Sequence, residues 1–487
     1  MKLRTGQDYL TALADDRNLW FSGERVNTIT DHPELSPIAK TLAEVFDLHN
    51  DPEYRDRLTC KDSDGQTINA SYRALDSIAA IGQRRETIDF WARRSGGVAG
   101  RIPDYQAIIN CGLYDMRHVI AAGNPQWLEN IENWFFRVRD NNLLQTHAFA
   151  DAPRDRNTPG ADPGYLKIVE RRAGGIVING AKSIATIAPF ADEFLGLTSP
   201  RPGMQAEEVL FFSLPMNADG LHIICRESLI PRAEAGHPLA PHWDELDAYM
   251  IFDHVLVPND RIFHLQPEGE VDINLLGQMF FGILSWPLWH ILARASVKLE
   301  LLIGLADSIT DHLGKRQDPA VIATLANMAI HLEAISALLY RAEHEPVPSA
   351  GGMLLPNPRQ ITAGRVAVVD NHPQLLQQLR ELSGSGIMMS PSSRELDHPD
   401  IGALMRANFV GNDPRATNRF ALQKLAWDLT CDSFGSRQLL FEMLNAGGAQ
   451  LNKTMFMETC DLTDARQLAM DLAGIGREGI DLLKKVR

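Results

Sequence analysis

The chain has 487 residues, of which 45% are hydrophobic, and this is enough for two or three domains around a large core. Its net charge of -15 argues against a nucleic-acid-binding protein, because phosphate recognition requires clustered Lys and Arg. Five scattered cysteines without a CxxC motif indicate reduced thiols in a cytoplasmic protein. We find no apolar signal segment at the start and no stretch of about 20 uninterrupted apolar residues, so no membrane span is predicted.

Residues 1–150 are predicted to form a mainly helical N-terminal domain. Ser36-Pro37 is an N-cap and first-turn pair ahead of apolar residues at helical spacing, and Asn124-Pro125 opens a helix that is expected to end at His147. Residues 151–270 instead contain short β-branched and aromatic runs bounded by turn residues, which predict a β-barrel or sandwich. The stretch "YLKIVERRAGGIVINGAKSIAT" predicts a hairpin within this central domain.

Residues 271–487 are predicted to form a C-terminal helical bundle. Asp318-Pro319 is expected to begin one helix, another is expected to run from Pro373 to Gly384, and residues 414–444 are expected to supply one further helix. The first long helix carries a single apolar stripe. The stripe consists of Leu288, Ile291, Leu292, Ala295, Leu299, Leu302, Ala306 and Ile309. The class is therefore α+β and mostly helical.

Several common cofactor and metal motifs are absent from the sequence. There is no GxGxxG between a predicted strand and helix, no Walker A motif, no HExxH and no GxSxG. The histidines are dispersed without metal-ligand spacing, so no metal site is predicted. These absences argue against a nicotinamide enzyme with a dinucleotide fold and against a metallohydrolase.

Four segments contain candidate functional residues, each with an ordinary structural alternative. Arg101 and Tyr105 flank a Pro103-Asp104 turn, which they could simply decorate or which could hold them as a donor pair. A histidine at a helix C-terminus, as expected for His147, is often only a favourable charge against the helix dipole.

The other candidate residues also have both a structural and a functional interpretation. Asp155 and Arg156 could be a surface ion pair, and Thr186 could simply end a strand, although a flat ligand could approach the small residues beside it. Gly447-Gly448 could be an ordinary helix C-cap or a turn whose amides meet an anion.

Six motifs in order, "GRIPDY", "THAFADAPRDR", "GAKSIATIAPFADEF", "DELDAYMIFDHVLVPNDRIF", "HILARASVKLELLIGLA" and "LAWDLTCDSFGSRQLLFEM", resemble the 4-hydroxyphenylacetate 3-hydroxylase family. These proteins are the oxygenase components of two-component flavin monooxygenases. The resemblance runs from "RTGQDYLTAL" to "FGSRQLLFEMLNAGG". It implies an acyl-CoA-dehydrogenase-like fold with an N-terminal helical domain, a central β-barrel or sandwich domain and a C-terminal four-helix bundle.

The resemblance also implies an activity and its cofactors. Reduced flavin (FADH2, with FMNH2 as an alternative) arrives from a separate NAD(P)H:flavin reductase and reacts with molecular oxygen to form a C4a-hydroperoxyflavin. The distal oxygen is then transferred to a phenol, ortho to its hydroxyl. The substrate is expected to be 4-hydroxyphenylacetate, a tyrosine-derived compound or a related phenol, and the assembly a cytoplasmic homotetramer.

Site residues follow from the same resemblance. Arg101 is expected to stabilise the developing oxyanion, Tyr105 to orient the substrate hydroxyl, and His147 to act as base or hydrogen-bond partner. Arg201, in the loop 198–207, either pairs with a substrate carboxylate or is a solvated arginine. The expected flavin contacts are His147, Pro153, Asp155, Arg156, Thr186, Asn445, Ala446, Gly447 and Gly448. Arg154 stands where many members have glutamine.

Three other readings compete with this one. A 4-hydroxybutyryl-CoA dehydratase-like enzyme would need cysteines and a histidine around an iron–sulfur cluster, but Cys60 and Cys111 are scattered and no cysteine is near His290 in the sequence. An acyl-CoA dehydrogenase-like enzyme would need a catalytic glutamate on the bundle, where Glu300 and Glu333 are more simply helix-surface charges. A non-catalytic scaffold is the third alternative.

Overall fold

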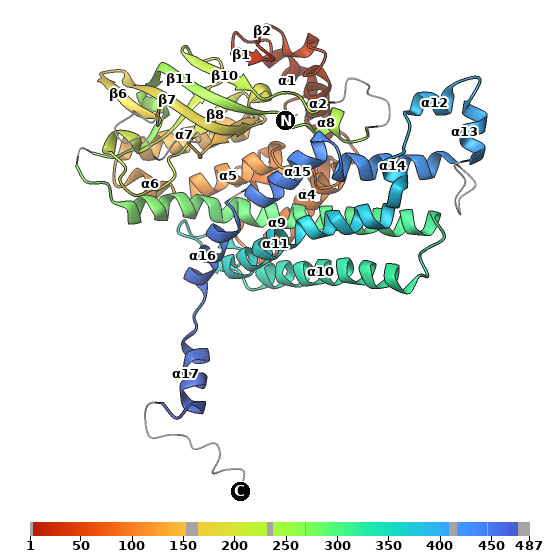
Figure 1. Cartoon of the computed structure of the whole chain (residues 1–487). Helices are drawn as coiled ribbons and strands as arrows, with labels where there is room; N and C mark the ends of the chain where they lie inside the picture. Colours follow the sequence, from red (N-terminus) through yellow and green to blue (C-terminus); the bar gives the residue numbers. More distant parts are fainter. Residues whose placement is uncertain are drawn as a thin grey trace.

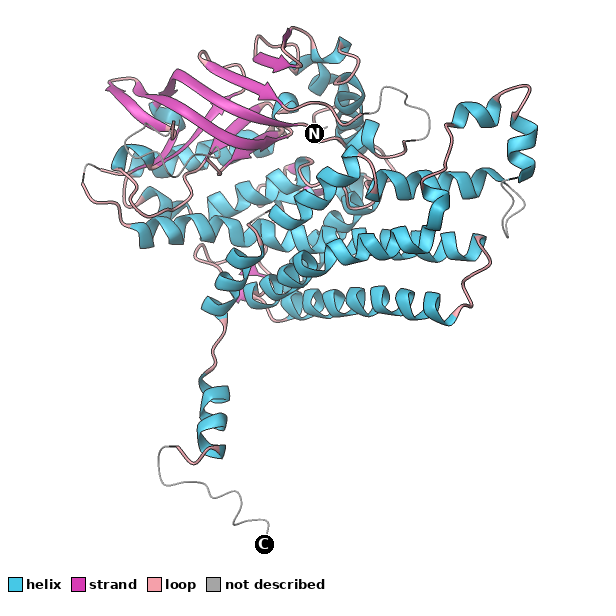
Figure 2. Ribbon diagram, in the orientation of Figure 1, coloured by secondary structure: helices cyan, strands magenta, loops and turns pink. Residues whose placement is uncertain are grey.

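The computed structural model describes residues 3–151, 164–230, 237–267, 269–408, 416–445 and 447–475. Most strands gather in one block, and long helices lie against it and extend beyond it (Figures 1 and 2). The order of helices, sheets and bundle along the chain agrees with the predicted mostly helical α+β class.

The first 150 residues contain more strand than the sequence pattern predicts. Their elements are α1 (Gly6–Ala12), β1 (Asn18–Phe21), β2 (Glu24–Val26), α2 (Ser36–Leu48), α3 (Arg55–Leu58), β3 (Thr59–Lys61), β4 (Thr67–Asn69), α4 (Ile78–Arg94), α5 (Pro103–Asp115), α6 (Arg117–Ala121), α7 (Pro125–Asp140) and β5 (Gln145–Ala148). Asn124 caps α7 as predicted, whereas the N-cap of α2 is Leu35 and not Ser36. Because β1 pairs with β10 and β5 pairs with β8, this region shares both large sheets with the next one.

Residues 165–265 form most of the two sheets. Their elements are β6 (Lys167–Arg172), β7 (Gly175–Thr186), β8 (Glu193–Gly196), β9 (Leu210–Pro215), β10 (Leu221–Cys225), α8 (Ala240–Trp243), β11 (Asp247–Pro258) and β12 (Ile262–Leu265). The strand orders are β2-β1-β10-β11-β7-β6 and β12-β9-β8-β5. The predicted hairpin is confirmed, since β6 and β7 are antiparallel with Arg172 opposite Gly175.

The remaining chain forms the bundle. Its elements are α9 (Ile273–His312), α10 (Pro319–His344), β13 (Val347–Pro348), β14 (Leu354–Leu355), α11 (Pro358–Ser383), α12 (Ser393–Asp397), α13 (Gly402–Asn408), α14 (Ala416–Thr430), α15 (Ser433–Leu444), α16 (Ala449–Thr459) and α17 (Thr463–Leu472). Every residue of the predicted apolar stripe on α9 is buried. Asp318 caps α10, and α11 stops at Gly384, which adopts a φ of 62°.

Two predicted helix boundaries in the bundle are wrong. The helix expected from Pro373 begins at Pro358, because Pro373 is tolerated inside α11, where buried residues on both sides keep the helix packed. The single helix expected over residues 414–444 is divided into α14 and α15. Asp432 separates them, because its carboxylate caps the new helix by accepting the Gly435 N–H at 3.0 Å.

Two helices, α9 and α10, are long and apolar enough to cross a membrane by length and composition. Helix α9 is the core of the bundle, and its apolar window is mostly buried. Helix α10 instead leaves Ile322, Ile330 and Tyr340 exposed. Helix α17 projects away from the body of the chain (Figure 1) and exposes Leu468 and Leu472. These apolar faces have no covering partner among the described residues.

Candidate active site

The segment that leads into α5 fixes the first two candidates. The backbone N–H groups of Gly100 and Arg101 both donate to the buried carboxylate of Glu245, the former at 2.8 Å. Pro103 is the first residue of α5, so the predicted turn is the first turn of a helix. The glycine run has a steric cause, because Gly97 has a φ of 74° and a Cβ there would lie 2.8 Å from the backbone nitrogen of Lys298.

Arg101 is buried and held in one orientation. Its guanidinium donates to the carbonyl of Gly100 at 3.0 Å and to the side-chain oxygen of Asn445. The guanidinium carbon lies 4.0 Å from the ring centre of Tyr105 and 5.2 Å from that of Phe441. Burial lowers the pKa of Arg101, although the neighbouring Tyr105 and Glu245 oppose this shift. The result is a desolvated cation over the face of the Tyr105 ring.

His147 lies in strand β5, not at the end of a helix as expected, since α7 already stops at Asp140. The helix-dipole explanation for this histidine is therefore wrong. Its Nδ1 is 3.1 Å from the side-chain oxygen of Gln106, and its ring stacks on Tyr105 with 5.9 Å between centroids. Burial and the positive charge of Arg101 lower the pKa of His147 well below 6.5, so the imidazole is neutral at physiological pH.

Tyr105 completes the group of three. It is almost fully buried, and Asp104 accepts its backbone N–H at 2.8 Å. Burial raises the pKa of the Tyr105 hydroxyl, which keeps it protonated and able to donate. The structure thus brings Arg101, Tyr105 and His147 together in one buried place.

A row of buried basic side chains on α9 lies behind this group. His290, Arg294 and Lys298 follow one another at four-residue spacing, so they share a helix face. His290 Nε2 is 2.8 Å from Asp104, and its ring meets that of Tyr105 edge to face at 5.2 Å. Sequence reasoning did not select this row, although the spacing of three polar residues beside an apolar stripe was a usable signal.

Glu442 of α15 neutralises part of this row. It accepts two hydrogen bonds from Arg294, at 2.7 and 2.9 Å, and one from Lys298 at 3.1 Å. Burial would raise the pKa of Glu442, but the charges of Arg294 and Lys298 hold it well below its usual value. Burial lowers the pKa of Lys298 to about 8.

Several buried or half-buried cations lie around Tyr105. Arg365 is fully buried, and its Nε and Nη1 have no hydrogen-bond partner among the described residues. The cations are the buried Arg101, Arg294, Lys298 and Arg365 and the half-buried Arg437, and the nearby carboxylates are Asp104, Asp244, Glu245, Asp247 and Glu442. The positive charge is therefore matched by carboxylates, while Arg365 keeps two donors without a described partner.

The predicted flavin contacts are only partly within the described residues. Thr186 ends β7, and its hydroxyl donates to Asp247 at 2.7 Å, so this donor is already used inside the protein. The side-chain oxygen of Asn445 accepts a hydrogen bond from Arg101, while the side-chain nitrogen Nδ2 of Asn445 is buried without a partner in the described part of the chain. A Cβ added at Gly448 would meet nothing within 4 Å, so the turn is open there. Pro153, Asp155, Arg156 and Ala446 lie outside the described residues.

Arg201 is not a solvated arginine. Its guanidinium lies 2.9 Å from Glu208 and 3.9 Å from Asp151, and its carbon sits 3.5 Å from the ring centre of Tyr165. Glu208 therefore already pairs with Arg201, whereas Asp151 is bonded to Lys182 at 2.7 Å.

The rival chemistries find little support in the described residues. His290 is paired with Asp104 and belongs to no cysteine-containing ligand group in this part of the chain. The one group of metal-ligand spacing found there is His237, Asp428 and Asp432, which the sequence did not reveal because its members are far apart along the chain. Glu300 is exposed and bonded to Arg93 at 2.7 Å.

Comparison with protein-family models identifies the family of this chain. The model for the N-terminal region of 4-hydroxyphenylacetate 3-hydroxylase matches residues 5–264, and the model for its C-terminal region matches residues 278–474. The chain belongs to the 4-hydroxyphenylacetate 3-hydroxylase family. The predicted family is therefore confirmed.

Individual relatives cover nearly the whole chain. A Rhodococcus opacus protein named 4-nitrophenol 4-monooxygenase/4-nitrocatechol 2-monooxygenase, oxygenase component, is 31% identical over 97% of this chain and 92% of its own length. The 4-hydroxyphenylacetate 3-monooxygenase oxygenase component of Thermus thermophilus is 32% identical over 90% of this chain and 91% of its own length.

Solved structures agree with the fold. The crystal structure of the oxygenase component of 4-hydroxyphenylacetate 3-monooxygenase, complexed with FAD, has a TM-score of 0.90 and 28% identity over 99% of this chain and all of that chain. An archaeal 4-hydroxybutyryl-CoA dehydratase has a TM-score of 0.85 at 19% identity over 98% of this chain and 96% of that chain, which shows a shared fold alone. The predicted acyl-CoA-dehydrogenase-like fold is confirmed.

Proposed function

We propose that this chain is the FADH2-dependent oxygenase component of a two-component monooxygenase that hydroxylates a phenol ortho to its hydroxyl. The observation that carries the proposal is the buried group of Arg101, Tyr105 and His147, in a member of a family whose relatives are named as phenol monooxygenases. The alternative dehydratase activity has no cysteine-containing ligand group among the described residues. For the dehydrogenase alternative, Glu300 is bonded to Arg93, and the buried Glu442 is held by Arg294 and Lys298.

The turn after α15 fits a flavin. Asn445 offers an unpartnered buried N–H, and the open backbone at Gly448 leaves room for a ligand against it. We assign flavin binding to Asn445, Ala446, Gly447 and Gly448, together with His147, Pro153, Asp155, Arg156 and Thr186. Thr186 would act through its backbone or its neighbours, because its hydroxyl is held by Asp247. Bound reduced flavin would supply the oxygen activation that no side chain can provide.

The three site residues explain how a phenol is made reactive. The ring is attacked more readily as the phenolate, and the cation of Arg101 favours that form. His147 is neutral, so it can accept the phenolic proton or a hydrogen bond from the hydroxyl. Tyr105 remains protonated and donates to the same oxygen. Burial of all three limits water, which would otherwise consume the activated oxygen.

The substrate class is a phenol with a substituent away from the reacting edge. Relatives are named for 4-nitrophenol, 2,4,6-trichlorophenol and 4-hydroxyphenylacetate. For this chain we propose a 4-hydroxyphenylacetate-like or tyrosine-derived phenol, with Arg201 facing the acidic tail. Arg201 contacts Glu208 through Nη2, and its Nη1 has no hydrogen-bond partner among the described residues, so this nitrogen is the donor proposed for the substrate carboxylate.

We further propose a cytoplasmic homotetramer and a separate NAD(P)H:flavin reductase as partner. The exposed apolar faces of α10 and α17 support self-association, because isolated apolar helix faces of this kind are usually covered in an assembly. Light scattering on the purified chain, with Leu468→Lys in α17 as a disrupting variant, tests the tetramer.

The activity is tested with the purified chain and separately reduced flavin. FADH2 or FMNH2 is mixed with oxygen and 4-hydroxyphenylacetate, and the catechol product and hydrogen peroxide are both measured. Phenylacetate, which lacks the hydroxyl, is the matched control. Formation of a catechol from 4-hydroxyphenylacetate but not from phenylacetate, with either FADH2 or FMNH2, supports the proposal. Hydrogen peroxide as the sole product with every phenol in a panel would contradict it.

A further inference from the structure

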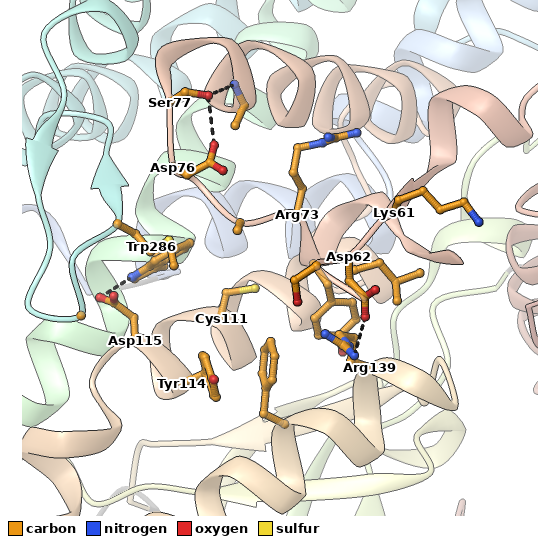
Figure 3. Close-up of a pocket in the computed structure, with 18 of the residues that line it drawn as sticks. Lys61, Asp62, Arg73, Asp76, Ser77, Cys111, Tyr114, Asp115, Arg139 and Trp286 are labelled. Atoms are coloured by element: carbon orange, nitrogen blue, oxygen red, sulfur yellow. Dashed lines mark hydrogen bonds and ion pairs between the residues drawn. The ribbon is translucent and has the colours of Figure 1, made fainter. Parts of the chain in front are cut away.

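A cavity lies between α4, α5, the β3–β4 hairpin and the first half of α9, and we call it the Arg73 cleft. It has a volume of about 770 Å³ and is lined among others by Lys61, Arg73, Cys111, Tyr114 and Trp286. Figure 3 shows Arg73 and Lys61 on one side of Cys111, with Trp286 and Tyr114 on the other. Arg101, Tyr105 and His147 do not line it, so it is distinct from the candidate active site.

One end of the Arg73 cleft is aromatic. Tyr114 stacks on Phe135 with 4.3 Å between ring centroids, and Tyr72 meets the same Phe135 edge to face at 5.8 Å. Trp286 is fixed by a hydrogen bond from its indole N–H to Asp115 at 3.3 Å. Rings held in this way offer flat faces and edges to an aromatic ligand without reorganisation.

The other end carries two cations, Arg73 and Lys61, that form no ion pair with a described carboxylate, although Asp76 also lines the cavity. The Arg73 guanidinium has no hydrogen bond or ion pair to any described residue, and its Nε is buried. The exposed Lys61 bonds no described group other than the hydroxyl of Thr67, at 2.8 Å. By contrast, Arg139 in the same wall is paired with Asp62 at 3.0 Å. A buried, unsatisfied guanidinium nitrogen is costly, and an anionic ligand would satisfy it.

The wall of the Arg73 cleft is preformed. The side-chain amide of Asn110 donates to the Tyr72 hydroxyl at 3.3 Å and also bonds Gln145 of β5. Arg84 is fully buried and holds the Arg73 carbonyl at 3.1 Å. A rigid cavity of this size suits a small molecule. We propose that the Arg73 cleft binds a flat aromatic molecule with an anionic group, its ring beside Tyr114 and Trp286 and its anion on Arg73 and Lys61.

The probe for this site is 2-naphthoate, which has an aromatic body and a carboxylate but no phenolic hydroxyl. Binding to the full-length chain is followed by quenching of tryptophan fluorescence and by calorimetry, with 2-naphthamide as the neutral match. Arg73→Met and Lys61→Met remove the two cations and keep the side-chain stems. Arg55→Met, at an exposed arginine of the same region, is the control, and Arg101→Met tests the other site.

We expect one 2-naphthoate per chain, with quenching that disappears in Trp286→Phe. Affinity should fall about tenfold or more in Arg73→Met, since a hydrogen bond to a charged group contributes that much, and less in Lys61→Met. Arg55→Met and Arg101→Met should bind as the unmodified chain does, and 2-naphthamide should bind more weakly. Equal binding by Arg73→Met, or loss of binding in Arg101→Met alone, overturns the proposal, as does the absence of any binding to the unmodified chain.

Discussion

The guanidinium carbon of Arg101 lies 4.0 Å from the centre of the Tyr105 ring, with Arg101 two residues before α5 and Tyr105 in its first turn. This stack places a desolvated cation beside a protonated phenol, while Glu245 holds the backbone of Arg101 and Asn445 its side chain.

Arg101→Lys should reduce the rate of product formation by about 100-fold or more, because a lysine cannot stack on Tyr105 and reach both Asn445 and Gly100 at once. Single-turnover hydroxylation with reduced FAD measures the change. Arg93→Lys, at an exposed pair with Glu300, is the control and should behave as the unmodified chain. A near-normal rate in Arg101→Lys would remove the guanidinium from the catalytic role.

His147→Ala should separate oxygen consumption from hydroxylation. The neutral imidazole is the group placed to accept the phenolic proton, and its loss should lower product formation by about 100-fold or more. Flavin binding should stay close to normal. The ratio of catechol to oxygen consumed and the Kd for FAD are the two measurements, with exposed His254→Ala as the control. Unchanged coupling in His147→Ala would exclude this role.

The pH profile should reflect the lowered pKa of His147. A histidine whose folded pKa lies below 6.5 is neutral at all pH values above that folded pKa, so its accepting form persists through pH 6.5. We therefore expect kcat/KM to stay constant from about pH 8 down to about pH 6 and to fall only at lower pH. An acid limb centred at the ordinary histidine value, absent in His147→Gln, would contradict the assignment.

Glu442→Gln should destabilise the fold by about 3 to 5 kcal/mol, because it leaves Arg294, Lys298 and Arg365 buried without their shared carboxylate. Glu300→Gln, at the surface, should cost at most about 1 kcal/mol. The folded pKa of Glu442 is depressed, so this stabilisation is present above the ordinary value of 4.5 and is lost as the pH falls through the folded value. Urea unfolding of the two variants gives the comparison, and equal midpoints would contradict the prediction.

Arg201→Met should raise KM about tenfold for 4-hydroxyphenylacetate and leave KM for neutral 4-methylphenol unchanged, if Arg201 binds an acidic tail. Glu208→Gln is the matched variant, because it frees the guanidinium from its carboxylate neighbour at 2.9 Å and should lower KM for the acid. Steady-state kinetics on both substrates tests this. An equal loss on the neutral phenol would assign Arg201 a purely structural role with Glu208 and Tyr165.

Local sequence patterns were sufficient to predict much of the secondary structure of this protein. The stripe on α9, the β6–β7 hairpin and the caps at Asn124 and Asp318 depend on residues a few positions apart, whose spacing the sequence displays directly. The motifs around Arg101 and His147 were also sufficient to indicate the family, although the prediction of a helix end at His147 was wrong because β5 is too short to show a period.

Only the tertiary structure decided which distant residues share the site. Glu442, Glu245 and Asn445 reach Arg294 and Arg101 across more than a hundred residues of chain, and nothing in their local sequence marks them as partners. The same holds for Arg73, which has no ion pair with a described residue because no described carboxylate folds within reach of its guanidinium. Local periodicity fixes which face of an element is buried, whereas ion pairs and cavities depend on how the elements pack, and packing is a property of the whole chain.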